Sequence, residues 1–156
     1  MLNKQDKKII ANAKKTALKG LEKFGIKDKF MVRVKDPKKE NWVAQYRCFS
    51  QFGKFGPIFW ISPCLLNQQD ELIISMLHEY GHVIAEYAWL KNTSIQKLIR
   101  RHWPGKDNLL NRDWDEEEFA EDFAHYIFGS SFVSSLIDKD AINKILKIYN
   151  KEVFID

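Results

Sequence analysis

Hydrophobic positions in the first third of the chain change from a helical period to the short apolar runs of strands. Residues 6–24 carry apolar side chains every three or four positions with lysines between them, which predicts an amphipathic helix that ends at Gly25. Three runs rich in β-branched and aromatic residues follow, bounded by Gly, Pro, Asn or Asp, and these predict short strands. The strands are expected at 30–34, 42–49 and 58–61.

The rest of the chain returns to a helical period. Apolar residues between Gln68 and Leu90 recur at spacings of three and four, which predicts a long helix. The polar stretch 106–115 is expected to be a loop. Shorter helices are expected at 95–103, 116–128 and 139–149. An N-terminal helix, a small three-stranded sheet and a helical half together indicate the α+β class, in one domain spanning residues 1–156.

Composition and charge narrow the class of protein. Of the 156 residues 45% are hydrophobic and 29% are charged, which is typical of a folded chain rather than a disordered one. The net charge of +4 is compatible with an acidic or nucleic-acid partner. The lysines of the first helix interleave with its apolar positions, so we interpret most of them as its solvated face. Nucleic acid is therefore not the expected partner.

Two further observations concern location. The chain has no apolar stretch of the length that a membrane helix needs, and its N-terminus lacks the apolar region of a signal peptide. We therefore expect a cytoplasmic protein, although an unconventionally secreted effector would have the same features. Cys48 and Cys64 are too few for a disulfide framework, and we expect both to be reduced thiols in the core.

The motif His78-Glu79-Tyr80-Gly81-His82 (HExxH) lies inside the long predicted helix. Residues four apart lie one turn above each other on a helix, so both imidazoles project from one face and can bind one ion. Glu79 is displaced by about 100°, which lets it act as a general base on water activated by zinc. The motif arises by chance in roughly half a per cent of chains of this composition. Two histidines with ordinary packing roles are the alternative.

A catalytic zinc usually has three protein ligands, so a third must come from farther along the chain. The extended motif HExxHxxGxxH is excluded because Ala85 and Ala88 occupy its Gly and His positions. The acidic helix behind Asp115 is the obvious source. Acids near a helix N-terminus also complement the helix dipole, and Asp115 with Glu118 has the spacing of a capping box. These ordinary roles account for Glu116 and Glu118 without any metal.

The faces of this helix discriminate between its glutamates. Its buried face is expected to consist of Phe119, Ala120, Phe123, Ala124 and Ile127. Glu117 lies beside that face and is our first choice as third ligand. Glu121, one turn later, is expected to orient a ligand or the substrate amine. Glu118 and Asp122 point nearly opposite, into water. Glu118 is the second choice as ligand and Glu121 the third.

The segment Glu117-Glu118-Phe119-Ala120-Glu121-Asp122-Phe123 resembles the glutamate helix of the anthrax lethal-factor-like metallopeptidases and, less closely, that of the ImmA/IrrE-type metallopeptidases. The resemblance covers roughly residues 56–128. It implies a minimal zincin-like domain, bound zinc, peptide-bond hydrolysis with Glu79 as base, and Glu117 rather than Glu118 as ligand. The ExEAN-like signature of the family is not intact, because Phe119 and Glu121 occupy two of its positions.

Two further expectations follow from this resemblance. Lethal-factor-like enzymes place a tyrosine that stabilises the transition state just before the glutamate helix, and this chain has none there. The available substitutes are Tyr126, His125, His102 and Arg112, although each such residue more often has an ordinary packing role. In such folds the strand before the HExxH helix is commonly the edge to which a peptide substrate adds. We therefore expect a substrate edge strand consisting of Ile58, Phe59, Trp60 and Ile61.

The sequence thus predicts a zinc-dependent metalloendopeptidase that acts on a protein or peptide, with a narrow target because the domain is small. Two other classes remain open. One is a non-proteolytic metal-binding regulator of phage or mobile-element type on a zincin scaffold. The other is a nucleic-acid-binding module with an incidental HExxH. The oligomeric state is not indicated by the sequence.

Overall fold

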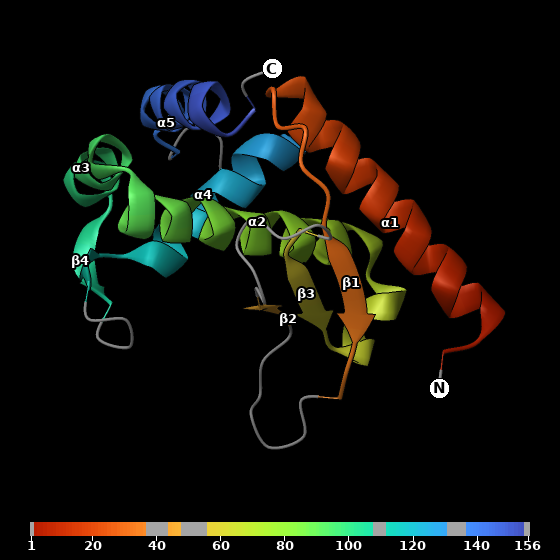
Figure 1. Cartoon of the computed structure of the whole chain (residues 1–156). Coiled ribbons are helices and arrows are strands. Elements are labelled where there is room, and N and C mark those ends of the chain that lie inside the picture. Colours follow the sequence, from red (N-terminus) through yellow and green to blue (C-terminus); the bar gives the residue numbers. More distant parts are fainter. Residues whose placement is uncertain (1, 37–43, 48–55, 108–111, 131–136, 155–156) are drawn as a thin grey trace.

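The computed structural model describes residues 2–36, 44–47, 56–107, 112–130 and 137–154. The described helices are α1 (Lys4–Lys23), α2 (Gln69–Lys91), α3 (Thr93–His102), α4 (Glu116–Phe128) and α5 (Lys139–Val153), with the 3-10 turn η1 (Pro63–Asn67). The described strands are β1 (Met31–Val34), β2 (Ala44–Arg47), β3 (Ile58–Ile61), β4 (Pro104–Asp107) and β5 (Arg112–Trp114). The fold is mixed and mostly helical with two small sheets, which agrees with the expected α+β class (Figure 1).

Helix α2 runs through the middle of the fold, and other elements pack around it (Figure 1). Apolar residues occupy nearly every side of this helix, and a helix that is hydrophobic all round becomes buried. It contacts α1, α3, α4, η1 and β2. The HExxH motif therefore lies on the central helix of the fold. The prediction that a long helix carries the motif is confirmed.

The three-stranded sheet has the order β1-β3-β2, with β3 parallel to β1 and antiparallel to β2. The prediction that Ile58, Phe59, Trp60 and Ile61 form the edge strand is therefore wrong, because they form the central strand. Phe59 and Ile61 are fully buried, and Phe59 stacks on Phe30 with ring centroids 4.6 Å apart. Packing on the core and pairing on both sides explain the central position. Among the described strands β1 and β2 form the edges, and β2 contacts α2.

The segment expected to be a loop contains a hairpin. Strands β4 and β5 pair antiparallel, with Pro104 opposite Trp114. Trp114 is completely buried, and the Asp115 N–H donates to the Trp103 carbonyl over 2.8 Å. A Cβ on Gly105 would lie 2.8 Å from the Asp115 Cβ, so the close approach requires glycine. Among the residues of this hairpin whose side chains the structure describes, Trp114 alone is buried, so they show no alternating apolar pattern from which strands could be predicted.

The other boundaries agree closely with the sequence. Helix α1 begins with a capping box between Asn3 and Asp6, and Gly25 with φ +85° follows its end. Asp115 caps α4 as predicted by accepting from the Glu118 N–H. Cys64 is exposed rather than in the core, and Cys48 lies outside the described residues. Among the described helices, none combines the length and apolar character that a membrane crossing requires.

Candidate metal centre

The close crossing of α2 and α4 creates the site. Gly81, inside the HExxH motif, faces Ala120 so closely that a Cβ on Gly81 would lie 2.8 Å from the Ala120 Cα and 3.0 Å from its Cβ. Two small residues at the contact let the helix backbones approach each other. The approach brings the acidic first turns of α4 beside the two histidines of α2. The sequence predicted Ala120 on the buried face of α4, and the structure shows that its partner there is Gly81.

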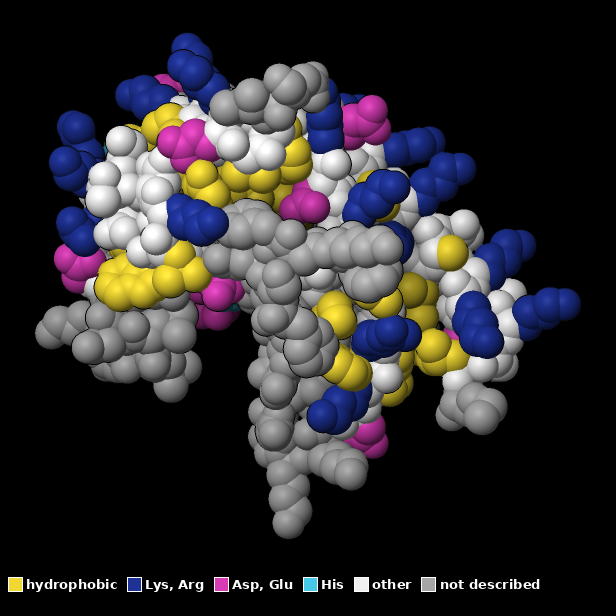
Figure 2. All heavy atoms as spheres, viewed as in Figure 1, with side chains coloured by type: hydrophobic (Ala, Val, Ile, Leu, Met, Phe, Trp, Pro, Cys, Tyr) yellow, Lys and Arg dark blue, Asp and Glu magenta, His cyan; other side chains and the backbone are white. Residues whose placement is uncertain are grey.

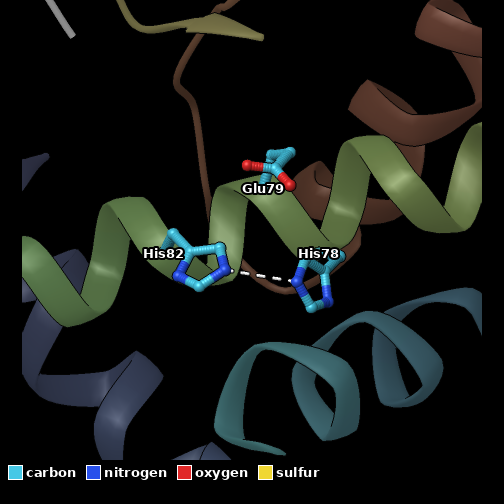
Figure 3. A group of neighbouring side chains, drawn as sticks. All are labelled: His78, Glu79 and His82. Carbon is cyan, nitrogen blue, oxygen red and sulfur yellow. Dashed lines mark hydrogen bonds between the residues drawn. The ribbon is translucent and has the colours of Figure 1, made fainter. Parts of the chain in front are cut away.

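The two motif histidines point toward one another from successive turns of α2 (Figure 3). The Nε2 atoms of His78 and His82 are 3.2 Å apart. Glu79 projects from a different side of the helix (Figure 3). One possible ligand atom from each of these three residues lies within 4.8 Å of the others, so the group can hold a metal ion.

Glu117 completes this arrangement from α4. Its Oε2 lies 3.1 Å from the His78 Nε2, and its Oε1 lies 3.0 Å from the His82 Nε2. Two imidazole nitrogens and one carboxylate therefore converge, as the sequence predicted for its first-choice third ligand. The Glu117 side chain is 71% exposed, so the convergence point is open to solvent on the α4 side.

The other ring nitrogen of each histidine donates to a second carboxylate. The His78 Nδ1 lies 2.9 Å from the Glu121 Oε2, and the His82 Nδ1 lies 2.7 Å from the Glu116 Oε2. A carboxylate that accepts from Nδ1–H leaves Nε2 free for a metal and fixes the orientation of the ring. Glu121 therefore contacts His78 in the way that the sequence suggested for a residue that orients a metal ligand.

Glu116 is a residue of the site that sequence reasoning missed. Its acidity has an ordinary explanation at a helix N-terminus, and this explanation hid its second role. Its position contained the signal, because Glu116 is three residues before Phe119 and four before Ala120, on the buried face of α4. The residue is only 4% exposed. A buried carboxylate on an apolar face requires a partner, and here His82 is that partner.

Glu118 and Asp122 take no part in the convergence. Glu118 is exposed, as predicted for the solvent side of α4. Asp122 was also predicted to point into water, but it is half-buried and accepts from the Trp103 Nε1 over 2.8 Å. Glu118 is therefore a poor candidate for the third ligand.

The carboxylates change the protonation of both histidines in the absence of an ion. Burial by itself lowers the pKa of His78, but hydrogen bonds to Glu117 and Glu121 overcome this effect and raise it to about 9. Burial opposes the same change at His82, where Glu116 and Glu117 raise the pKa to about 10. The two histidines in turn lower the pKa of Glu117 well below its usual range. With these pKa values, each ring carries protons on both of its nitrogens around neutral pH unless a metal displaces one of them.

Glu79 is, like Glu116, a buried glutamate of the cluster. The residue is 4% exposed, and burial raises its pKa to about 7, although the neighbouring His82 and His78 oppose this shift. A carboxyl group whose pKa lies near neutrality is suited to accept and return a proton. This property fits the role predicted for Glu79.

The suggested transition-state donors have other partners. Tyr126 lies away from the site, where its hydroxyl donates to the Asn143 Oδ1 and its ring packs against Phe24. Tyr126 therefore has the ordinary packing role that was the alternative for it, because nine residues after Glu117 place it on the opposite face of α4. His102 donates to the Asp138 Oδ2 over 2.7 Å, and the side chain of Arg112 lies outside the described part of the chain.

His125 remains near the centre without being part of it. Its Nε2 lies 2.9 Å from the Glu121 Oε1, and its Nδ1 lies 2.8 Å from the Ser130 Oγ. Its contact with the cluster therefore runs through Glu121 rather than directly to either motif histidine.

Comparisons of the chain with protein-family models, with curated proteins and with solved structures gave no match. The donor atoms of the site then indicate which metal ions it suits. Two imidazole nitrogens and one carboxylate oxygen suit zinc or another transition metal, whereas calcium and magnesium prefer oxygen ligands alone. Three protein donors also leave a position open, which is typical of catalytic rather than structural zinc sites.

Proposed function

We propose that this chain is a zinc metallopeptidase with a zincin-like fold, in which His78, His82 and Glu117 hold the metal. One observation carries the proposal: both Nε2 atoms face the same carboxylate, while each Nδ1 donates to a carboxylate of its own. Two surface histidines with ordinary packing roles have no need of such an arrangement. Metal-binding histidines usually have it, because the outer hydrogen bond fixes the ring and its tautomer.

The residues of the chain divide the chemistry between them. When bound, zinc supplies Lewis acidity, which polarises a carbonyl group and lowers the pKa of water toward 7. Glu79 accepts the proton of the attacking water and returns it to the amine that leaves. Its burial keeps the carboxyl in a site of low polarity, where the proton is held near neutral pH. Glu116 and Glu121 hold the two rings in place throughout.

Strand β2 replaces β3 as the proposed substrate edge. It pairs with β3 on one side, forms an edge of the described sheet and contacts α2. An extended peptide that adds to such an edge gains main-chain hydrogen bonds, which supply affinity. The substrate class that fits is a protein or peptide segment in extended conformation, and the small size of the domain favours a narrow target.

The metal centre is tested by elemental mass spectrometry of the purified wild type and three variants. About one zinc per wild-type chain is expected, because the donor set forms a single site. His78→Ala and Glu117→Ala are expected to lose the zinc. Glu118→Ala is the matched control, because it removes the neighbouring glutamate on the solvent side of α4, and it is expected to keep the zinc. Zinc retained in His78→Ala would contradict the proposed centre.

The reaction is tested with a peptide library derived from whole-cell protein, with products identified by mass spectrometry. Glu79→Gln is the decisive comparison, because it keeps the shape of the side chain and removes the base. Cleavage by the zinc-loaded wild type and its loss in a Glu79→Gln protein that still binds zinc would support a peptidase. Stoichiometric zinc without cleavage in either protein would favour the non-proteolytic metal-binding regulator instead.

A further inference from the structure

Both carboxylate oxygens of Glu121 accept a hydrogen bond from an imidazole. Its Oε2 accepts from the His78 Nδ1 over 2.9 Å, and its Oε1 accepts from the His125 Nε2 over 2.9 Å. The carboxylate thus lies between one histidine of the HExxH motif and one histidine of its own helix. The side chain of Glu121 is 52% exposed, whereas that of His125 is 20% exposed.

The geometry of α4 creates this pairing. Glu121 and His125 are four residues apart and lie on the same face, one turn above each other. The helix ends at Gly129 with φ +84°, a left-handed conformation that favours glycine. Beyond it, the Ser130 N–H donates to the His125 carbonyl, and the Ser130 Oγ lies 2.8 Å from the His125 Nδ1. The His125 ring is therefore held at both nitrogens, at Nδ1 by Ser130 beyond the end of the helix and at Nε2 by Glu121 one turn earlier.

The hydrogen bond from His125 restricts the conformations of the Glu121 side chain. A half-exposed glutamate normally samples several rotamers and is hydrated, so that it holds a distant ring only part of the time. Here the second hydrogen bond selects the rotamer in which Oε2 faces His78. The outer support of the site thus extends from His78 through Glu121 and His125 to the end of α4.

We propose that His125 is a positioning residue of the metal centre, which holds the Glu121 carboxylate on the His78 Nδ1 and thereby strengthens metal binding. The inference rests on the proposed metal centre of His78, His82 and Glu117. It differs from the transition-state role that the sequence suggested for His125, because His125 acts through Glu121 and need not touch the substrate. Outer partners of metal-binding histidines typically contribute about 10–100-fold to metal affinity.

The test measures the zinc dissociation constant of the intact 156-residue chain by competition with a chromophoric chelator. His125→Ala is expected to weaken zinc binding about tenfold. His125→Gln keeps an N–H donor at nearly the same reach and is expected to restore binding to within about threefold of the wild type. Tyr126→Phe is the matched control, because it alters the next residue of α4 on the opposite face, and it is expected to leave zinc binding unchanged. Urea unfolding of the metal-free variants verifies that each is folded.

A double-variant comparison tests the route through Glu121. In a Glu121→Ala background, His125→Ala is expected to cause no further loss of zinc affinity, since residues that act as a unit are not additive. An equal loss in both backgrounds would overturn the proposal, as would wild-type affinity in His125→Ala or an equal weakening in Tyr126→Phe. These results would leave the metal centre intact. A wild type that binds no zinc, or whose binding does not depend on His78, would instead refute the proposed function and the inference with it.

Discussion

Gly81→Ala tests the helix crossing on which the whole site depends. The added Cβ would lie 2.8 Å from the Ala120 Cα and 3.0 Å from the Ala120 Cβ. Neither atom belongs to the end of a flexible side chain, so α4 has to move away from α2. Alanine favours a helix by up to about 1 kcal/mol over glycine, whereas overpacking a well-packed contact costs about 1–3 kcal/mol. Because the contact involves backbone, we expect the cost to prevail and the protein to lose about 1–2 kcal/mol of stability.

The assay combines urea unfolding of the metal-free protein with chelator competition for zinc. Gly20→Ala is the matched control, because Gly20 is also inside a helix and packs against α4. Its added Cβ would meet the Ile127 Cγ2 at 3.2 Å, and that side-chain methyl group can shift by a few tenths of an ångström. We expect Gly20→Ala to leave zinc affinity unchanged and Gly81→Ala to weaken it, because the glutamates of α4 move with their helix. Equal or greater stability of Gly81→Ala with wild-type zinc affinity would refute this account of the crossing.

Three further predictions concern the cluster and its support. Glu116→Gln is expected to weaken zinc binding about tenfold, because it weakens the hold on the His82 ring; Glu118→Gln is expected to leave it unchanged, and chelator competition would measure both. Zinc binding is expected to strengthen as pH rises toward 9, because the pKa values of His78 and His82 are about 9 and 10 and a protonated ring cannot bind a metal. Calorimetry at pH 7–8 in buffers of different ionisation enthalpy is then expected to detect about two protons released per zinc, and no release would contradict the raised pKa values. Tyr80→Phe removes a buried hydroxyl with two hydrogen-bond partners, Asp28 and Tyr149, and is expected to lower the free energy of unfolding in urea by about 1–3 kcal/mol. The variant is expected to bind one zinc still, and loss of zinc would mean that this hydrogen-bond network supports the metal centre directly.

The strong local patterns were the ones that the sequence predicted correctly. The helix that carries the HExxH motif, the cap at Asp115 and the span of α4 follow from periodicity and capping chemistry over adjacent residues. Counting around α4 also places Glu117 beside the buried face of that helix. Each of these features depends on residues that are close in the chain, whereas the contact of Glu117 with both histidines depends on how α2 and α4 cross.

The features that the sequence did not predict depend on contacts between distant segments. The order β1-β3-β2 places β3 in the centre, and a strand of four residues contains no information on which neighbours it will have. The β4–β5 hairpin depends on the burial of Trp114 rather than on an alternating pattern. The role of Glu116 requires knowing that His82 faces the first turn of α4. Such pairings are decided by tertiary packing, which a single sequence does not display.

The hydrogen bonds of the cluster explain how so many charges can be held at the α2–α4 crossing. Around neutral pH the two histidines hold one more proton each than neutral rings, because their pKa values are about 9 and 10. These two protons contribute the same charge of +2 as a zinc ion and lie on nitrogens that face the same carboxylate, Glu117. Exchange of two protons for one zinc at the proposed centre would therefore leave the net charge of the cluster unchanged. The glutamates that surround the histidines would need no new partner in this exchange, so the helix crossing would not have to rearrange. The same charge balance would couple metal binding to pH, because the ion would compete for the positions that the protons occupy.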